Sequence, residues 1–205
     1  MLTLGKPSYK VLCHFLAEQS ERKFSYLDVG ATATSPPVGF VADQTRIRLG
    51  EGESTFRKAI AALQGWKHFR LGWVDAWPLE TPIKPDETVV VLGRAMGLWW
   101  LNSCRIIYVV DESGPICRFG FAYGTLPKHI EKGEERFLIE WDQHDNGVWY
   151  DILAFSQPNY LVTRVGYPLV RRMQKQFGRD SAAAVFRAVN EFDPIPEIGQ
   201  STNWG

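Results

Sequence analysis

The chain has 205 residues, of which 45% are hydrophobic and 22% are charged, as is usual for a soluble globular protein. Lysine plus arginine and aspartate plus glutamate each number 23, so the formal net charge is zero. Nucleic-acid-binding domains usually carry a basic excess, so we expect no nucleic-acid partner. The length suits one main domain, which we place at residues 39–192, with an N-terminal extension (1–38) and a C-terminal tail (193–205).

Three cysteines, Cys13, Cys104 and Cys117, form no CxxC motif, and their odd number argues against a disulfide framework. We interpret them as reduced thiols. The first 20 residues have no signal-peptide pattern. Together these features predict a cytoplasmic protein without a cysteine-based zinc site.

In chain order, the pattern first predicts a short helix over Pro7–Ser20 and a loop over Phe24–Pro37. Gln44–Leu49 alternates polar and apolar residues, which is typical of a strand. A helix is expected near Glu53–Trp66, where apolar residues recur at spacings of three and four.

Strands follow that helix, and an Asn-Gly turn between the last two is a strong hairpin signal. The stretch Val89–Val110 is apolar enough to raise the question of a membrane span, but glycines and arginines interrupt it, so we expect two strands and no transmembrane segment. The predicted strands are Leu71–Trp77, Thr88–Met96, Leu98–Val110, Ile116–Thr125, Glu134–Asp142 and Val148–Ser156.

A long helical pattern runs from about Asn159 to Phe192. Pro168 lacks an amide hydrogen and cannot sit undisturbed within a helix, so we expect a break there, with Pro168 beginning the main helix. The tail after Phe192, which contains two prolines, is expected to be disordered.

This order of elements resembles the START/Bet v 1-like (SRPBCC) helix-grip fold. The resemblance implies an α+β protein in which a curved antiparallel sheet of about seven strands wraps around a long C-terminal helix. An amphipathic helix is a natural cover for the apolar face of such a sheet, and a pocket between the two is plausible. We expect it to hold a small apolar or amphipathic molecule, and we expect no cofactor. The oligomeric state stays open.

Another set of residues recurs in a fixed order along much of the chain. These residues are Gly39–Phe40, Leu49–Gly52, Ala59, Leu63, Trp66, Phe69, Trp73, Tyr108–Asp111, Phe121–Leu126, His129, Gly133–Phe137, Val148–Ile152, Phe155–Pro158 and Gly166–Pro168. In them the chain is similar to the UPF-0548 family, a family of unknown function. Asp151 departs from that family, since members often have glutamate there.

His129, Glu134 and Glu135 are the candidate catalytic residues, because a histidine near carboxylates can transfer protons at neutral pH. On this interpretation the protein is an enzyme of the cyclase, isomerase or hydrolase type. The alternative is a loop histidine beside a solvated glutamate pair. These residues offer too few ligands for a metal ion, so we expect none.

Candidate ligand-binding residues combine strand aromatics with polar groups in apolar strands. Asp151 is expected to face the concave side of the sheet and to pair with Arg94, Arg105, Tyr108 or Tyr123, because an unpaired buried carboxylate is costly. The alternative is that these charged side chains face solvent. The full set is Arg94, Arg105, Tyr108, Phe119, Phe121, Tyr123, His129, Glu134, Trp149 and Asp151.

A third possibility is an adaptor for a membrane surface or another protein. It would use the basic stripe that Arg171, Arg172, Lys175 and Arg179 form on the last helix. Such a stripe is also typical of a solvated helix face.

Overall fold

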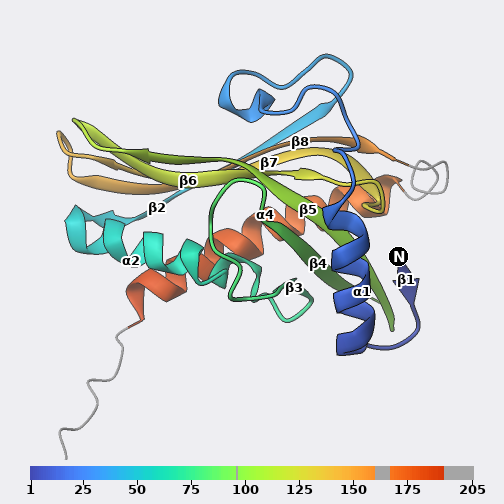
Figure 1. Ribbon diagram of the computed structural model, residues 1–205. Coiled ribbons are helices and arrows are strands. Elements are labelled where there is room, and N and C mark those ends of the chain that lie inside the picture. Colours follow the sequence, from blue (N-terminus) through green and yellow to red (C-terminus); the bar gives the residue numbers. More distant parts are fainter. Residues whose placement is uncertain (96, 160–166, 192–205) are drawn as a thin grey trace, which may run out of the picture.

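A curved antiparallel sheet and a long helix beneath its concave face dominate the computed structural model (Figure 1). The structure describes residues 1–95, 97–159 and 167–191. The sheet has eight strands in the order β2-β8-β7-β6-β5-β4-β3, and β1 pairs with β5 at one side. The strands are β1 (Leu2–Thr3), β2 (Val41–Glu51), β3 (Val74–Trp77), β4 (Thr88–Ala95), β5 (Leu98–Glu112), β6 (Ile116–Thr125), β7 (Glu131–Asp142) and β8 (Gly147–Pro158).

The α-helices among the described residues are α1 (Tyr9–Ser20), α2 (Gly52–Gln64) and α4 (Tyr167–Asn190), with short 3-10 turns η1 (Ala31–Ala33) and η2 (Lys67–Phe69). Helices α2 and α4 lie under the concave face, whereas α1 packs outside on β4 and β5 (Figure 1). The main core lies between the sheet and the two inner helices. There Trp66, Phe69, Phe121 and Phe137 are fully buried.

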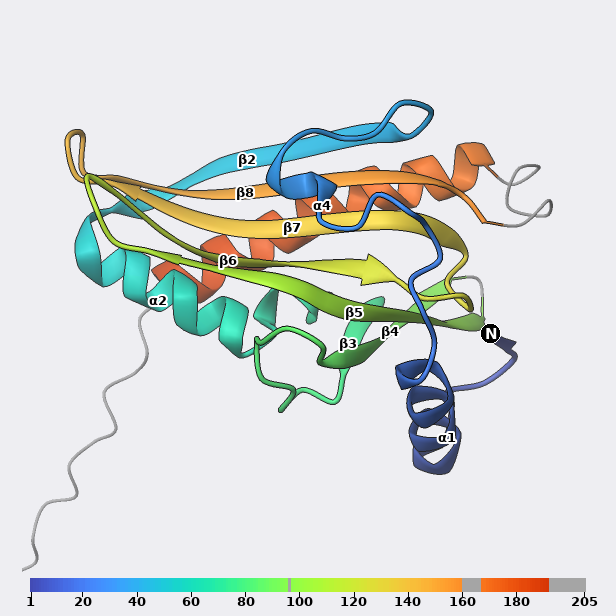
Figure 2. The ribbon, with the colours of Figure 1, turned by 45° about the horizontal axis from the view of Figure 1, so that its top comes forward.

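The loop at residues 24–37, which we call the strap, crosses the convex face over β7 and β8 (Figure 2). Successive side chains of a strand point to opposite faces. On β7, odd-numbered residues such as Phe137 face the core, and even-numbered residues such as Glu134 face the strap. This parity decides which polar side chains reach the interior.

Gly133 allows the backbones of β7 and β8 to approach each other closely. A Cβ atom at this position would lie 1.9 Å from the carbonyl oxygen of Phe155, so a larger residue cannot be placed there. Gly133 lies between Glu131 and Glu135, and all three residues line the cavity described below.

The predicted element order and the helix-grip arrangement are confirmed. Strand β7 begins at Glu131, three residues before the expected start at Glu134. Strand β3 is shorter than predicted because Gly72 takes a positive φ of 78°, which interrupts extended backbone. Helix α4 starts at Tyr167 with Pro168 in its first turn, as expected. The linker 160–166 and the predicted tail lie outside the described residues.

Candidate functional site

A cavity of about 410 Å³ lies between the concave face of the sheet and the N-terminal half of α4. Apolar and aromatic side chains from η2, the sheet and α4 form much of its wall. They include Phe69, Trp73, Val74, Val91, Trp100, Tyr123, Ile152, Ala154, Met173 and Phe177. The volume lies at the lower end of the range usual for small-molecule pockets.

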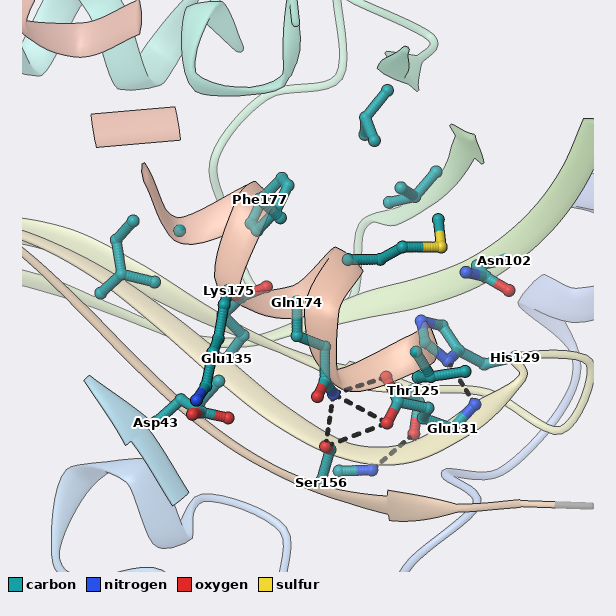
Figure 3. Close-up of a pocket in the computed structure, with 18 of the residues that line it drawn as sticks. Asp43, Asn102, Thr125, His129, Glu131, Glu135, Ser156, Gln174, Lys175 and Phe177 are labelled. Carbon is teal, nitrogen blue, oxygen red and sulfur yellow. Dashed lines mark hydrogen bonds between the residues drawn. The ribbon is translucent and has the colours of Figure 1, made fainter. Parts of the chain in front are cut away.

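Polar side chains gather at one end of this cavity (Figure 3). The amide nitrogen of Gln174, on α4, donates to both carboxylate oxygens of Glu131, on β7, at 2.7 Å each. It also contacts Ser156 Oγ, which donates to Glu131 at 3.2 Å. These bonds connect α4 to β7 and β8 across the cavity.

Burial raises the pKa of Glu131 to about 7, although its hydrogen bonds with Ser156 and Gln174 act in the opposite direction. Arg171 lies one turn before Gln174 and forms an ion pair with Asp43 on β2. Its guanidinium also donates to Gln174 Oε1 at 2.6 Å. The guanidinium of Arg171, which lies near this end of the cavity, is therefore already bonded to Asp43 and Gln174.

Glu135 lies two residues after Gly133 and also faces the cavity. The hydroxyl of Tyr123, on β6, donates to its carboxylate at 2.8 Å. Burial raises the pKa of Glu135 to about 7, and the nearby carboxylates of Glu131 and Asp43 add to this effect. A carboxyl group with such a pKa can hold or release a proton at neutral pH.

His129 lines the cavity close to Glu131 (Figure 3). Its Nδ1 accepts a hydrogen bond from the backbone amide of Glu131 at 3.0 Å, so in the neutral ring Nε2 carries the hydrogen. Burial lowers the pKa of His129 to about 4, which keeps the ring neutral at pH 7. The histidine thus offers an N–H donor rather than a positive charge.

The carboxylate of Glu134 does not belong to this polar group, although Glu134 is among the residues that border the cavity. Its carboxylate points to the convex face and accepts bonds from Tyr26 Oη, the amides of Gly30 and Thr32, and Thr32 Oγ1. The strap therefore closes over Glu134. The expectation that Glu134 lies with His129 at the mouth of the pocket is wrong for its carboxylate, whereas Glu135 faces the cavity, since neighbouring strand residues face opposite ways.

Asp151 is buried and paired, but on the convex face. Its carboxylate accepts bonds from Gln44 at 2.6 Å and Arg136 at 3.1 Å, and Arg46 lies 3.6 Å away. The expectation that it faces the concave side is wrong, because on β8 Tyr150 and Ile152 take the core positions and Asp151 lies between them. None of the four partners suggested from the sequence contacts it among the described residues.

Other predicted ligand-binding residues also lie outside the cavity. Arg105 donates to the backbone carbonyl of Arg22 at 2.9 Å, and Tyr108 bonds to Thr32 under the strap at 2.7 Å. Arg94 is exposed, near Trp99. Trp149 stacks with Arg46 on the convex face.

Phe119, Phe121 and Tyr123 share the inner face of β6, as the alternation predicted. Tyr123 borders the cavity, whereas the two phenylalanines are packed within the core and do not line it. Of the predicted catalytic and ligand-binding residues, Tyr123, His129 and Glu135 are the ones whose side chains the structure brings to the cavity.

The sequence analysis missed Glu131, Gln174, Ser156, Asn102 and Thr125, which also line the cavity. Glu131 could have been found by extending the alternation of β7 backwards from Glu135, because the two share a face. Nothing in the local pattern of α4 distinguishes Gln174 from an ordinary surface glutamine.

Three residues of the basic stripe on α4, Arg172, Lys175 and Arg179, are exposed, whereas Arg171 faces the sheet. Arg171 bonds to Asp43, and the exposed Lys175 and Arg179 border the mouth of the cavity. Within the described ranges, no group of three histidine, cysteine, aspartate or glutamate side chains is placed to share a metal ion. No described helix is long and apolar enough to cross a membrane.

A family described as "Domain of unknown function (DUF1990)" matches residues 25–184 of the chain. A UPF0548 protein of Dictyostelium discoideum is 40% identical over 217 residues, covering 97% of this chain and all of that protein. The chain belongs to the UPF0548 (DUF1990) family. A UPF0548 protein of Deinococcus radiodurans is 36% identical over 200 residues, covering 92% of this chain and 98% of the relative.

Two solved structures show more distant similarity to this UPF0548 protein. Ara h 8.0201 is 10% identical with a TM-score of 0.45, over 72% of this chain and 98% of that one. Human STARD10 is 10% identical with a TM-score of 0.38, over 87% of this chain and 83% of that one.

Proposed function

We propose that this UPF0548 protein binds a small hydrophobic or amphipathic molecule in the cavity between the sheet and α4. One observation carries the proposal: an apolar-walled cavity of about 410 Å³ has its polar groups concentrated at one end. Such a distribution suits a ligand with an apolar body and a polar head. The N–H of His129 would orient an oxygen of that head, while Phe69 and Phe177 would contact the body.

Native mass spectrometry of the protein purified from its own host tests this proposal directly. We expect an added mass that denaturation releases. Ala154→Phe fills the cavity wall and should abolish both the added mass and the binding of the neutral dye Nile red, without loss of fold. Ala42→Phe, at an exposed site on β2, is the control and should retain binding. Equal dye binding by wild type and Ala154→Phe would contradict the proposal.

A second candidate is catalysis in the same cavity, of the cyclase, isomerase or hydrolase type. It is supported by the pairing of Glu135 with Tyr123 and by the pKa of about 7, which suits a general acid or base at neutral pH. The co-purified molecule should then be the substrate or product. Wild-type protein should convert it, and Glu135→Gln should slow the conversion by about 100-fold or more. Stable binding without conversion favours the first proposal.

A further inference from the structure

The groups around the Glu135 carboxylate are either neutral or negatively charged. Its hydrogen bond among the described residues comes from a neutral hydroxyl, that of Tyr123, and the two charged groups that act on it most are the carboxylates of Glu131 and Asp43. An ionised carboxylate in a cavity, without a cation beside it, is unfavourable.

Among the described residues, no basic side chain of the neighbouring elements pairs with Glu135. Arg171 is held by Asp43 and Gln174. Arg136, the next residue of β7, lies on the convex face. Its guanidinium donates to Asp151 and to the backbone carbonyl of Thr32 in the strap. Lys175 and Arg179 of α4 line the cavity and are exposed to solvent, and Lys175 extends towards Asp43 (Figure 3). In the part of the chain that the structure describes, no positive charge therefore pairs with Glu135 inside the cavity.

We infer that the ligand carries a protonated amine, which pairs with the Glu135 carboxylate inside the cavity. This inference rests on the proposed function and specifies its ligand class, a cationic amphiphile. The aromatic rings of Phe69, Trp73 and Tyr123 in the cavity wall favour the same charge, because ring faces attract cations. An anionic head group would bind poorly, because it would lose its hydration shell and lie beside the carboxyl groups of Glu131 and Glu135.

Binding of an amine to Glu135 should depend on pH in a characteristic way. Glu135 is partly protonated near neutral pH, and an ammonium group binds its ionised form, so binding must displace a proton from the carboxyl group. The affinity for an amine should therefore rise from pH 6 to pH 8. A carboxylic acid would behave in the opposite way, because it must itself be protonated to fit beside Glu131 and Glu135.

Three probes with the same alkyl chain separate the possibilities: octylammonium, octanol and octanoate. Isothermal titration calorimetry would be run with the full-length protein at pH 6 and pH 8. At pH 8 we expect octylammonium to bind about tenfold more tightly than octanoate, because only the ammonium group forms a charge-assisted bond with the ionised Glu135. Glu135→Gln should weaken octylammonium binding by about tenfold and change octanol binding by less than about twofold. Glu112→Gln removes an exposed carboxylate at the end of β5 and should behave as wild type.

The outcomes distinguish this inference from the proposal beneath it. If octanol or octanoate binds as well as octylammonium, the amine class is wrong and binding in the cavity stands. If none of the three binds, both are contradicted. Comparing the three probes on the wild-type protein tests the amine preference even if Glu135→Gln does not fold. Retention of the amine preference in a folded Glu135→Gln variant would also overturn the role of Glu135.

Discussion

Gln174 on α4 holds both carboxylate oxygens of Glu131 on β7, each at 2.7 Å. The two residues are far apart in the sequence, and they meet at the polar end of the cavity (Figure 3). Arg171, one turn earlier, forms a second connection to the sheet through Asp43. The N-terminal half of α4 is thus fixed above the cavity by polar contacts, whereas its C-terminal half packs through Val185 and Val189 in the core.

Replacing Gln174 with alanine should lower the free energy of unfolding by about 1–2 kcal/mol, because the Glu131 carboxylate then keeps, among the described side chains, only the bond from Ser156. Urea denaturation at pH 7 measures this loss. Gln176→Ala is the matched control, since its amide nitrogen bonds to Asp180 within the same helix at 3.3 Å. Equal stability of the two variants would show that the contact with Glu131 contributes nothing.

Asp151→Asn should lower the free energy of unfolding by about 1–3 kcal/mol, because it leaves Arg136 without its charged partner under the strap. Ligand affinity should not change, since Asp151 lies on the convex face. Thermal denaturation and a binding titration together measure both effects. Asp111→Asn, at an exposed position on β5, serves as control. A loss of affinity with unchanged stability would contradict this placement.

The sequence predicted the elements well because hydrophobic periodicity and turn residues are local signals. The Asn-Gly turn and the alternation of Phe137 and Ile139 set the β7–β8 hairpin before any tertiary contact is known. The faces of polar residues were harder to predict. Both faces of β8 are apolar, because the strap covers the convex one, so alternation alone could not tell where Asp151 points.

The candidate site was predicted only in part, for a related reason. Glu134 and Glu135 look equivalent in sequence, yet Glu134 anchors the strap and Glu135 faces the cavity. Their difference depends on the strand register. Gln174 becomes important only when α4 crosses Glu131, a long-range contact that no local pattern encodes.

The stability of the protein should depend on pH through Glu135. Its pKa is about 7 in the folded state and 4.5 in the unfolded chain, so the folded state binds more protons between these values. The contribution to stability is present below pH 4.5 and is lost as the pH rises towards 7. Glu135→Gln removes this dependence. Its stability relative to wild type should therefore increase by about 2–3 kcal/mol from pH 5 to pH 8 in urea unfolding. A difference that stays constant with pH would contradict the burial of this carboxyl group.

His68 provides the opposite dependence. It is fully buried against Trp66, Phe69 and Phe137, and neither ring nitrogen has a hydrogen-bond partner among the described residues. Burial lowers its pKa from 6.5 to about 3, so its neutral form is favoured in the folded state. Stability is retained above pH 6.5 and lost as the pH falls towards 3.

His68→Leu replaces the unsatisfied ring with an apolar side chain of similar size. The variant should be about 1 kcal/mol more stable than wild type at pH 7, because two unpaired polar atoms are removed from the core. The advantage should grow by about 2 kcal/mol at pH 5, where the unfolded chain of wild type gains a proton on His68 and the folded state does not. Urea unfolding at both pH values measures this change. His144→Leu alters an exposed histidine between β7 and β8 and should show no such pH dependence. A loss of stability in His68→Leu at both pH values would mean that the imidazole has a stabilising partner in the core.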